Sequence, residues 1–144
     1  MYENILLPTD GSDAMTDVID QAVSLANIHD ATLHALYVVN TASLTDLPME
    51  SSWEGVSNAL KNEGQHALEQ VENRAEDVSL EQTMIDGSPA KEIVRYAGDN
   101  DCDVIVMGTH GRSGFDRLLL GSVAERVVRS SAVPVLTIRV SRPS

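Results

Sequence analysis

Two patterns of apolar and polar residues follow one another along the chain. One is a short apolar run, and the other is a longer stretch in which apolar residues recur every three or four positions. The short runs have the length of strands, and the run at 104–107 is continuously apolar, as is typical of parallel strands buried on both faces. The pattern therefore predicts five strands, at Ile5–Leu7, Thr32–Val39, Leu80–Ile85, Val104–Met107 and Val133–Val140.

The first helical stretch follows the first strand. Ser12 or Asp13 suits the role of its N-cap, because short polar side chains accept hydrogen bonds from first-turn amides. Its apolar face is made by Ala14, Val18, Ala22 and Leu25.

Three further helices are expected between the later strands. A polar, amphipathic helix is expected over Glu54–Asp77, after a loop at 41–53 that has no clean period. Ser88 as N-cap and Pro89 at the first helical position predict a helix that runs to about Gly98. The last helix is expected at Gly121–Arg129.

Strands that alternate with helices predict an α/β fold in three layers. We expect a Rossmann-like, five-stranded parallel sheet with helices on both faces and the strand order 3-2-1-4-5. A length of 144 residues predicts a single domain, 1–144. Ligands of such folds bind beyond the carboxyl ends of the strands, where the strand order reverses, so the turns after Leu7, Val39 and Met107 are the places to search.

Composition narrows the class of protein. No apolar run approaches the roughly 18 residues that a membrane span needs, and the first residues lack the basic start of a secretory signal, so we expect a cytoplasmic location. The single cysteine, Cys102, excludes an internal disulfide framework and a site of several cysteines for a metal.

Charge adds a second constraint. The formal net charge is −12, with only two lysines, which favours a salt-adapted protein over an ordinary acidic one because salt screens the repulsion between carboxylates. Residues 1–90 hold 16 acidic and 2 basic residues, whereas residues 91–144 hold 6 and 8. The second part therefore tolerates an anionic ligand, and the acidic balance of the whole argues against binding long nucleic acid.

Four residues carry the candidate chemistry, in the pattern Gly108-x2-Gly111-x9-Gly121-Ser122. Glycine lets a backbone approach a ligand closely, and free amides at a helix start attract phosphate. The P-loop pattern, with its lysine, does not occur in the chain. A phosphate cradle built mainly of backbone amides is therefore the prediction, and ordinary turn glycines are the alternative.

The spacing resembles the nucleotide-binding motif of the universal stress protein family, G-x2-G-x9-G-[S/T]. The sequences ILLPTDGS at 5–12, DVIVMGTHG at 103–111 and PVL at 134–136 resemble that family's first, fourth and fifth strands. The resemblance implies a member that binds ATP, or another adenine nucleotide, with Mg²⁺ or Mn²⁺ on the phosphates. It also implies a homodimer, formed through the last strand, Val133–Val140.

Carried over position by position, the resemblance implies a binding site of ten residues. The nucleoside end would be lined by Pro8, Thr9, Asp10, Val38, Met107 and Gly108. The phosphates would meet the amides of Gly111, Gly121, Ser122 and Val123, and the Ser122 hydroxyl.

Several of these assignments keep an alternative. Asp10 also suits a turn or cap, and His110 suits loop packing better than the role of a general base. Arg112 and Arg117 suit phosphate neutralisation and solvated loop charges equally. We expect no catalytic residue and no metal held by the protein alone.

Three functions follow from these expectations. The first is a dimeric, nucleotide-dependent regulatory or stress-response protein. The alternatives are a slow ATP hydrolase and a dimeric interaction protein that ignores nucleotide. The glycine spacing would have no use in the last.

Overall fold

A computed structural model describes residues 1–40, 53–109 and 121–140, with side chains described from Asn58 onward in the second of these ranges. The chain forms β1 (Asn4–Pro8), α1 (Met15–His29), β2 (Thr32–Asn40), α2 (Trp53–Arg74), β3 (Ser79–Gly87), α3 (Pro89–Asp99), β4 (Val104–Gly108), α4 (Ser122–Ser130) and β5 (Val135–Ile138). All strand pairs are parallel, and the sheet order is β3-β2-β1-β4-β5. The predicted α/β fold and its strand order are confirmed.

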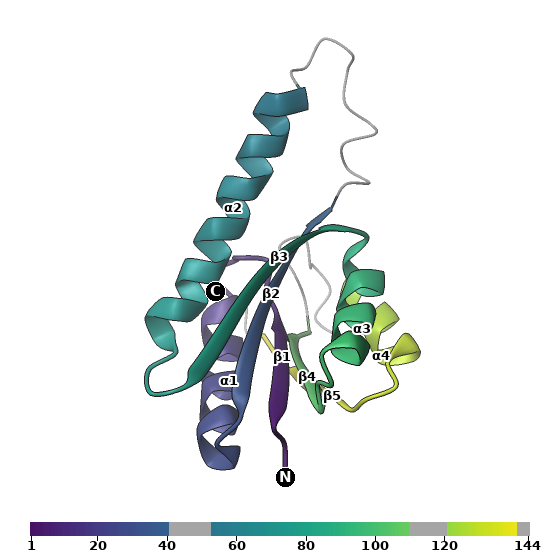
Figure 1. Cartoon of the computed structure of the whole chain (residues 1–144). Helices are drawn as coiled ribbons and strands as arrows, with labels where there is room; N and C mark the ends of the chain where they lie inside the picture. The colour runs from purple at the N-terminus through teal and green to yellow at the C-terminus, as the bar shows by residue number, and fades with distance from the viewer. Residues whose placement is uncertain (41–52, 110–120, 141–144) are drawn as a thin grey trace.

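The sheet lies between two layers of helix. Figure 1 shows α1 and α2 on one face and α3 and α4 on the other. Successive residues of β1 serve opposite faces, since Ile5 and Leu7 belong to the core beneath α1 and α2, and Leu6 belongs to the core beneath α3 and α4. This double burial explains the continuous apolar runs of β1 and β4.

The sheet order reverses between β1 and β4. Residues of β1 pair with β2 from Asn4 to Pro8, but they pair with β4 only at Ile5–Val104 and Leu6–Ile105. The shared ladder thus ends before either strand does. A crevice between the carboxyl ends of β1 and β4 is the expected result, at the switch point where this fold class binds ligands.

Gly64 brings α2 close to the sheet. A Cβ atom built there would lie 2.7 Å from both the Tyr37 ring and the end of Met84. The lower part of the helix packs through Ala67, Leu68 and Val71, which are buried. Figure 1 shows the upper part of α2 rising beyond the sheet.

Three predicted boundaries were wrong in detail. The first helix begins at Met15 with Ala14 as N-cap and no capping side chain, because the amides of Met15 and Thr16 bond to the backbone carbonyls of Ser12 and Asp13. The second helix ends at Arg74 rather than Asp77, which has a positive φ of 60°.

The last strand spans Val135–Ile138 rather than Val133–Val140. Pro134 lies just outside it, as expected of a residue without an amide proton, although its carbonyl accepts a hydrogen bond from Ile105 at 3.0 Å.

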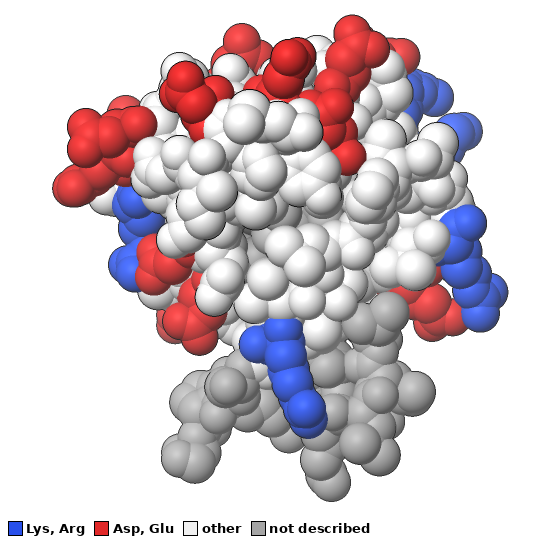
Figure 2. All heavy atoms as spheres, turned by 90° about the horizontal axis from the view of Figure 1, so that it is seen from below, with Lys and Arg blue, Asp and Glu red and all other residues white. Residues whose placement is uncertain are grey.

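The acidic first part of the chain builds one side of the sheet. It supplies β3, β2 and β1 with their helices, whereas the later part supplies β4 and β5, so the switch point lies on the boundary between them. Figure 2 views the end where the amino terminus lies and shows carboxylates gathered on one side of that face. Helices among the described residues are too short or too polar to cross a membrane.

Candidate functional site

The loop after β1, residues 9–14, lies at the switch point; we call it the β1–α1 loop. Thr9 is buried, its amide donates to the Leu36 carbonyl at 2.9 Å, and its hydroxyl accepts from the Gly11 amide at 3.1 Å. Gly11 has a φ of 76°, which glycine adopts without strain. The Asp10 carboxylate accepts from the Ser12 amide at 2.9 Å. Asp10 therefore forms the turn that was its alternative role, and it does so just beyond the carboxyl end of β1.

The end of β4 faces this loop across the switch point. Met107 is buried in the core under α3 and α4, and the chain becomes half-buried at Gly108 and Thr109. The Thr109 amide donates to the Ile138 carbonyl at 3.0 Å, and its hydroxyl accepts from the Val140 amide at 3.2 Å. Thr109 thereby fixes the carboxyl end of β4 against the end of β5.

Helix α4 begins beside this strand end. Gly121 is its N-cap, with φ −61° and ψ 157°, and the cap has no side-chain hydrogen bond. The amides of Ser122 and Val123 stand in the first turn, where a helix offers no acceptor of its own, and the Ser122 side chain is exposed. These two amides are the donors that the helix start offers to an anion.

The Gly121 amide departs from the prediction. It donates to the Thr109 carbonyl at 2.5 Å, so it holds the helix start against β4 and does not point to a ligand. The glycine fixes the position of α4, and the donors predicted for phosphate reduce to Ser122 and Val123 among the described residues.

Helix α3 offers a comparison at the same edge of the sheet. It also begins after a strand and also lacks a side-chain cap, but Pro89 occupies its first turn. Proline has no amide proton, so this helix start has one donor fewer. Of the two helices, α4 has the fuller set of amides, and it stands next to the switch point.

The remaining predicted residues lie around the same edge. Val38 belongs to β2, where it pairs with Ile85, and it packs with Val123 against the core that holds Met107. Pro8 ends β1 and is buried. Gly111, like His110, Arg112 and Arg117, lies outside the described residues.

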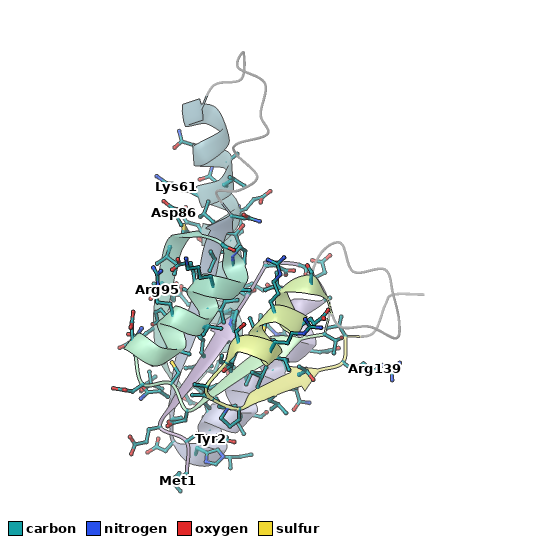
Figure 3. All side chains as sticks on the ribbon, turned by 90° about the vertical axis from the view of Figure 1, so that its right-hand side faces the viewer. Met1, Tyr2, Lys61, Asp86, Arg95 and Arg139 are labelled. Atoms are coloured by element: carbon teal, nitrogen blue, oxygen red, sulfur yellow. The ribbon has the colours of Figure 1, made fainter. Side chains whose placement is uncertain are left out.

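Side chains labelled in Figure 3 mark the two ends of the sheet. Figure 3 shows Lys61 and Asp86 toward the carboxyl end of the sheet, Met1 and Tyr2 at the opposite end, and Arg139 beside β5. No group of three or more metal-ligating side chains comes together in the described part of the chain.

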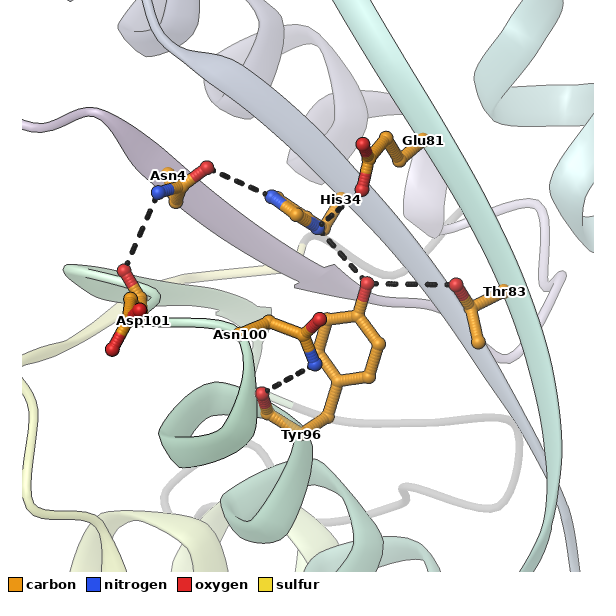
Figure 4. A network of polar contacts seen from close by, with 7 residues as sticks. All are labelled: Asn4, His34, Glu81, Thr83, Tyr96, Asn100 and Asp101. Atoms are coloured by element: carbon orange, nitrogen blue, oxygen red, sulfur yellow. Dashed lines mark hydrogen bonds and ion pairs between the residues drawn. The ribbon is translucent and has the colours of Figure 1, made fainter.

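Two polar features were missed by sequence reasoning. Gln70 of α2 donates from its amide to the Ser12 carbonyl at 3.2 Å, across 58 positions of sequence. His34 of β2 is buried and contacts Tyr96, Asn4 and Glu81 (Figure 4). A buried histidine in a strand is a weak signal of such a network, and a polar helix residue gives no signal at all.

The sequence is similar to known proteins along almost its whole length. The model of the universal stress protein family matches residues 1–139. Universal stress protein MJ0531 of Methanocaldococcus jannaschii is 45% identical over 141 residues, 96% of this chain and 83% of the relative.

Solved structures share the fold. Protein MJ0577 of the same organism matches with a TM-score of 0.86 at 28% identity, over 99% of each chain. A universal stress protein solved in complex with cAMP matches with a TM-score of 0.71 at 24% identity, over 96% of this chain and 98% of that one.

Proposed function

The chain belongs to the universal stress protein family, and from this premise we propose that it binds ATP at the carboxyl edge of its sheet. The observation that carries the proposal is the start of α4, where first-turn amides without a partner among the described residues stand beside the switch point. A protein of the same fold has been solved in complex with cAMP, which supports an adenine nucleotide as the class of ligand.

The phosphates are assigned to the start of α4. The amides of Ser122 and Val123, the Ser122 hydroxyl and the positive end of the helix dipole would act together on the negative charge there. Gly111 is assigned to the same cradle from the motif alone, and Gly108, which has no Cβ atom, is assigned to the nucleoside end.

The nucleoside is assigned to the opposite wall. Asp10 is held by its bond to the Ser12 amide, which leaves its other oxygen for a ribose or base hydrogen bond. Pro8, Thr9, Val38 and Met107 would form the apolar and backbone surface beside it. Mg²⁺ or Mn²⁺ would accompany the phosphates, which supply the negative oxygens that such ions prefer.

A proline substitution tests the amide directly. Ser122→Pro removes one amide proton and the hydroxyl, yet the first position of a helix tolerates proline, and Gly121 already has the extended backbone that proline requires before it. Hydrogen bonds to charged groups contribute about 1.5–3 kcal/mol, so we expect MgATP to bind about 10- to 100-fold more weakly by calorimetric titration in molar salt.

Two variants serve as controls for this measurement. Ser122→Ala keeps the amide and should lose only about three- to tenfold in affinity. Pro89→Ser gives α3 the amide donor that it lacks and should leave the affinity for MgATP unchanged.

A separate variant, Gly121→Val, should block nucleotide binding, because its side chain would stand at the cradle. A folded, nucleotide-stripped parent that does not bind MgATP would overturn the proposal.

We further propose a homodimer through the last strand. β5 is at the edge of the sheet, and Leu136 on it is 42% exposed, an apolar edge that a second copy could cover. Leu136→Glu should convert the dimer to monomer in light scattering. A parent that is already monomeric at high concentration contradicts this assignment.

The proposed role is regulatory binding in a cytoplasm of high salt, not turnover. Repulsion among the carboxylates of a chain with net charge −12 should make stability rise with salt concentration. Phosphate release from MgATP well above background, lost in His110→Ala or Arg112→Ala, would instead favour the slow hydrolase.

A further inference from the structure

We propose that Gln70 of α2 is a positioning residue for the nucleotide site, because it fixes the β1–α1 loop that holds Asp10. This inference rests on the proposed function for its ligand, but the contact itself is independent of it. Gln70 donates from Nε2 to the Ser12 carbonyl at 3.2 Å. The amide of the same Ser12 donates to the Asp10 carboxylate at 2.9 Å. One residue of the loop thus joins the helix to the carboxylate at the site.

Backbone bonds hold the two ends of the loop, since the Thr9 amide donates to the Leu36 carbonyl and the Met15 amide donates to the Ser12 carbonyl at 3.1 Å. Between these ends, the amides of Gly11 and Ser12 bond to the side chains of Thr9 and Asp10, which belong to the loop itself. Local bonds of this kind shape a turn, but they do not anchor it to the rest of the protein. The Gln70 contact reaches it from an element 58 positions away, so it constrains where the turn lies.

The surroundings of Gln70 favour positioning over stability. Its Oε1 atom is buried and accepts no hydrogen bond among the described residues. The reverse amide orientation would place an oxygen against the Ser12 carbonyl, so the donor assignment stands. A buried acceptor without a donor offsets much of what the Nε2 bond contributes to stability. The main effect of Gln70 is therefore to fix the position of the loop, and its net contribution to the free energy of unfolding is small.

Arg74 provides a natural reference one turn farther along α2. Residues four apart lie on the same helix face. Arg74 bonds to the Asp20 carboxylate of α1 at 2.8 and 2.7 Å, so it ties α2 to α1 without touching the loop. If Gln70 acted only by docking α2, loss of the Arg74 contact would have the same effect on the site.

The test uses Gln70→Met, which keeps the volume and removes the donor. We expect the Ser12 amide of the nucleotide-free protein to exchange its hydrogen about tenfold faster or more, with the melting temperature changed by no more than about 3 °C. MgATP should bind about three- to tenfold more weakly. Gln70→Glu turns the donor into an acceptor facing the Ser12 carbonyl and should weaken binding at least as much.

Two matched variants complete the experiment. Gln65→Met makes the same change on the exposed face of α2 and should alter neither exchange nor affinity. Arg74→Met should lower stability and leave the Ser12 amide and nucleotide affinity unchanged.

The outcomes separate the two proposals. A parent that binds no nucleotide overturns the proposed function, whatever the exchange data show. A parent that binds MgATP while Gln70→Met binds equally well overturns the positioning role, and so does an Arg74→Met variant with the same loss as Gln70→Met.

Discussion

At the amino end of the strands, polar side chains bond to one another, whereas at the carboxyl end the first amides of α4 have no capping side chain among the described residues. His34 contacts the Tyr96 hydroxyl at 2.9 Å and the Asn4 side chain at 3.0 Å. Tyr96 in turn lies 3.4 Å from the Thr83 hydroxyl (Figure 4). These polar groups of the amino end thus find their partners within the chain.

The Asp103 carboxylate continues this pattern at the start of β4. It accepts from the Glu3 amide at 2.7 Å and from the Asn4 amide at 2.9 Å, which ties β4 to the beginning of β1. The same two strands are the ones that share no ladder at their other ends. Polar side chains join the two strands at one end, whereas at the other end the Ser122 and Val123 amides have no partner among the described residues, which makes that end the candidate site for an anion.

The comparison predicts that changes at the amino end affect stability and leave nucleotide binding intact. The largest effect is expected for His34→Ala, because the imidazole is buried and both ring nitrogens have partners. The variant loses the packing of the ring and leaves the Tyr96 hydroxyl and the Asn4 side chain without this hydrogen-bond partner. We therefore expect the free energy of unfolding to fall by about 2–4 kcal/mol in urea titrations. Affinity for MgATP measured in the folded variant should not change; a loss there would break the comparison.

Asp103→Ala should have a smaller effect of the same kind. The carboxylate is near the surface, so its two charged hydrogen bonds are expected to contribute about 1–2 kcal/mol. These amide bonds lower the pKa of Asp103 from its usual 3.8. Its contribution is therefore present above that value and is lost as the pH falls through the lower, folded pKa. The variant should lack this acid-dependent part of the parent's unfolding curve.

The pH dependence of the His34 network lies in a different window. Burial lowers the pKa of His34 from 6.5, against the opposing influence of the Glu81 carboxylate. Below pH 6.5 the unfolded chain takes up the proton before the folded one, so stability falls as the pH drops from 6.5 toward the folded pKa. A His34→Gln variant should flatten this part of the stability profile. A parent whose stability rises on acidification through this range would show that the folded network prefers the charged ring.

Features that depend on local sequence patterns could be predicted, whereas contacts between distant residues could not. β1 and β4 could be predicted because burial on both faces makes them continuous apolar runs, and the α/β order indicated the carboxyl edge as the place to search for a site. The start of α1 was misplaced, because backbone carbonyls rather than Ser12 or Asp13 side chains bond its first amides. The link from Gln70 to Ser12 joins residues 58 positions apart through a common polar side chain, so no local pattern records it.

The smallest effect is expected where a helix ends at the amino edge. Asp30 closes α1 in the left-handed conformation, with φ 54° and ψ 44°, and its amide bonds back into the helix. Glycine takes this conformation without the steric cost of a Cβ atom, and a carboxylate at the carboxyl end of a helix also opposes the helix dipole. Asp30→Gly should therefore raise the free energy of unfolding by about 0.5–1 kcal/mol. Asp30→Asn removes only the charge, and its gain should shrink in molar salt, whereas the conformational gain of Asp30→Gly should persist. Equal gains in the two variants at high salt would mean that the left-handed backbone at this position carries no strain.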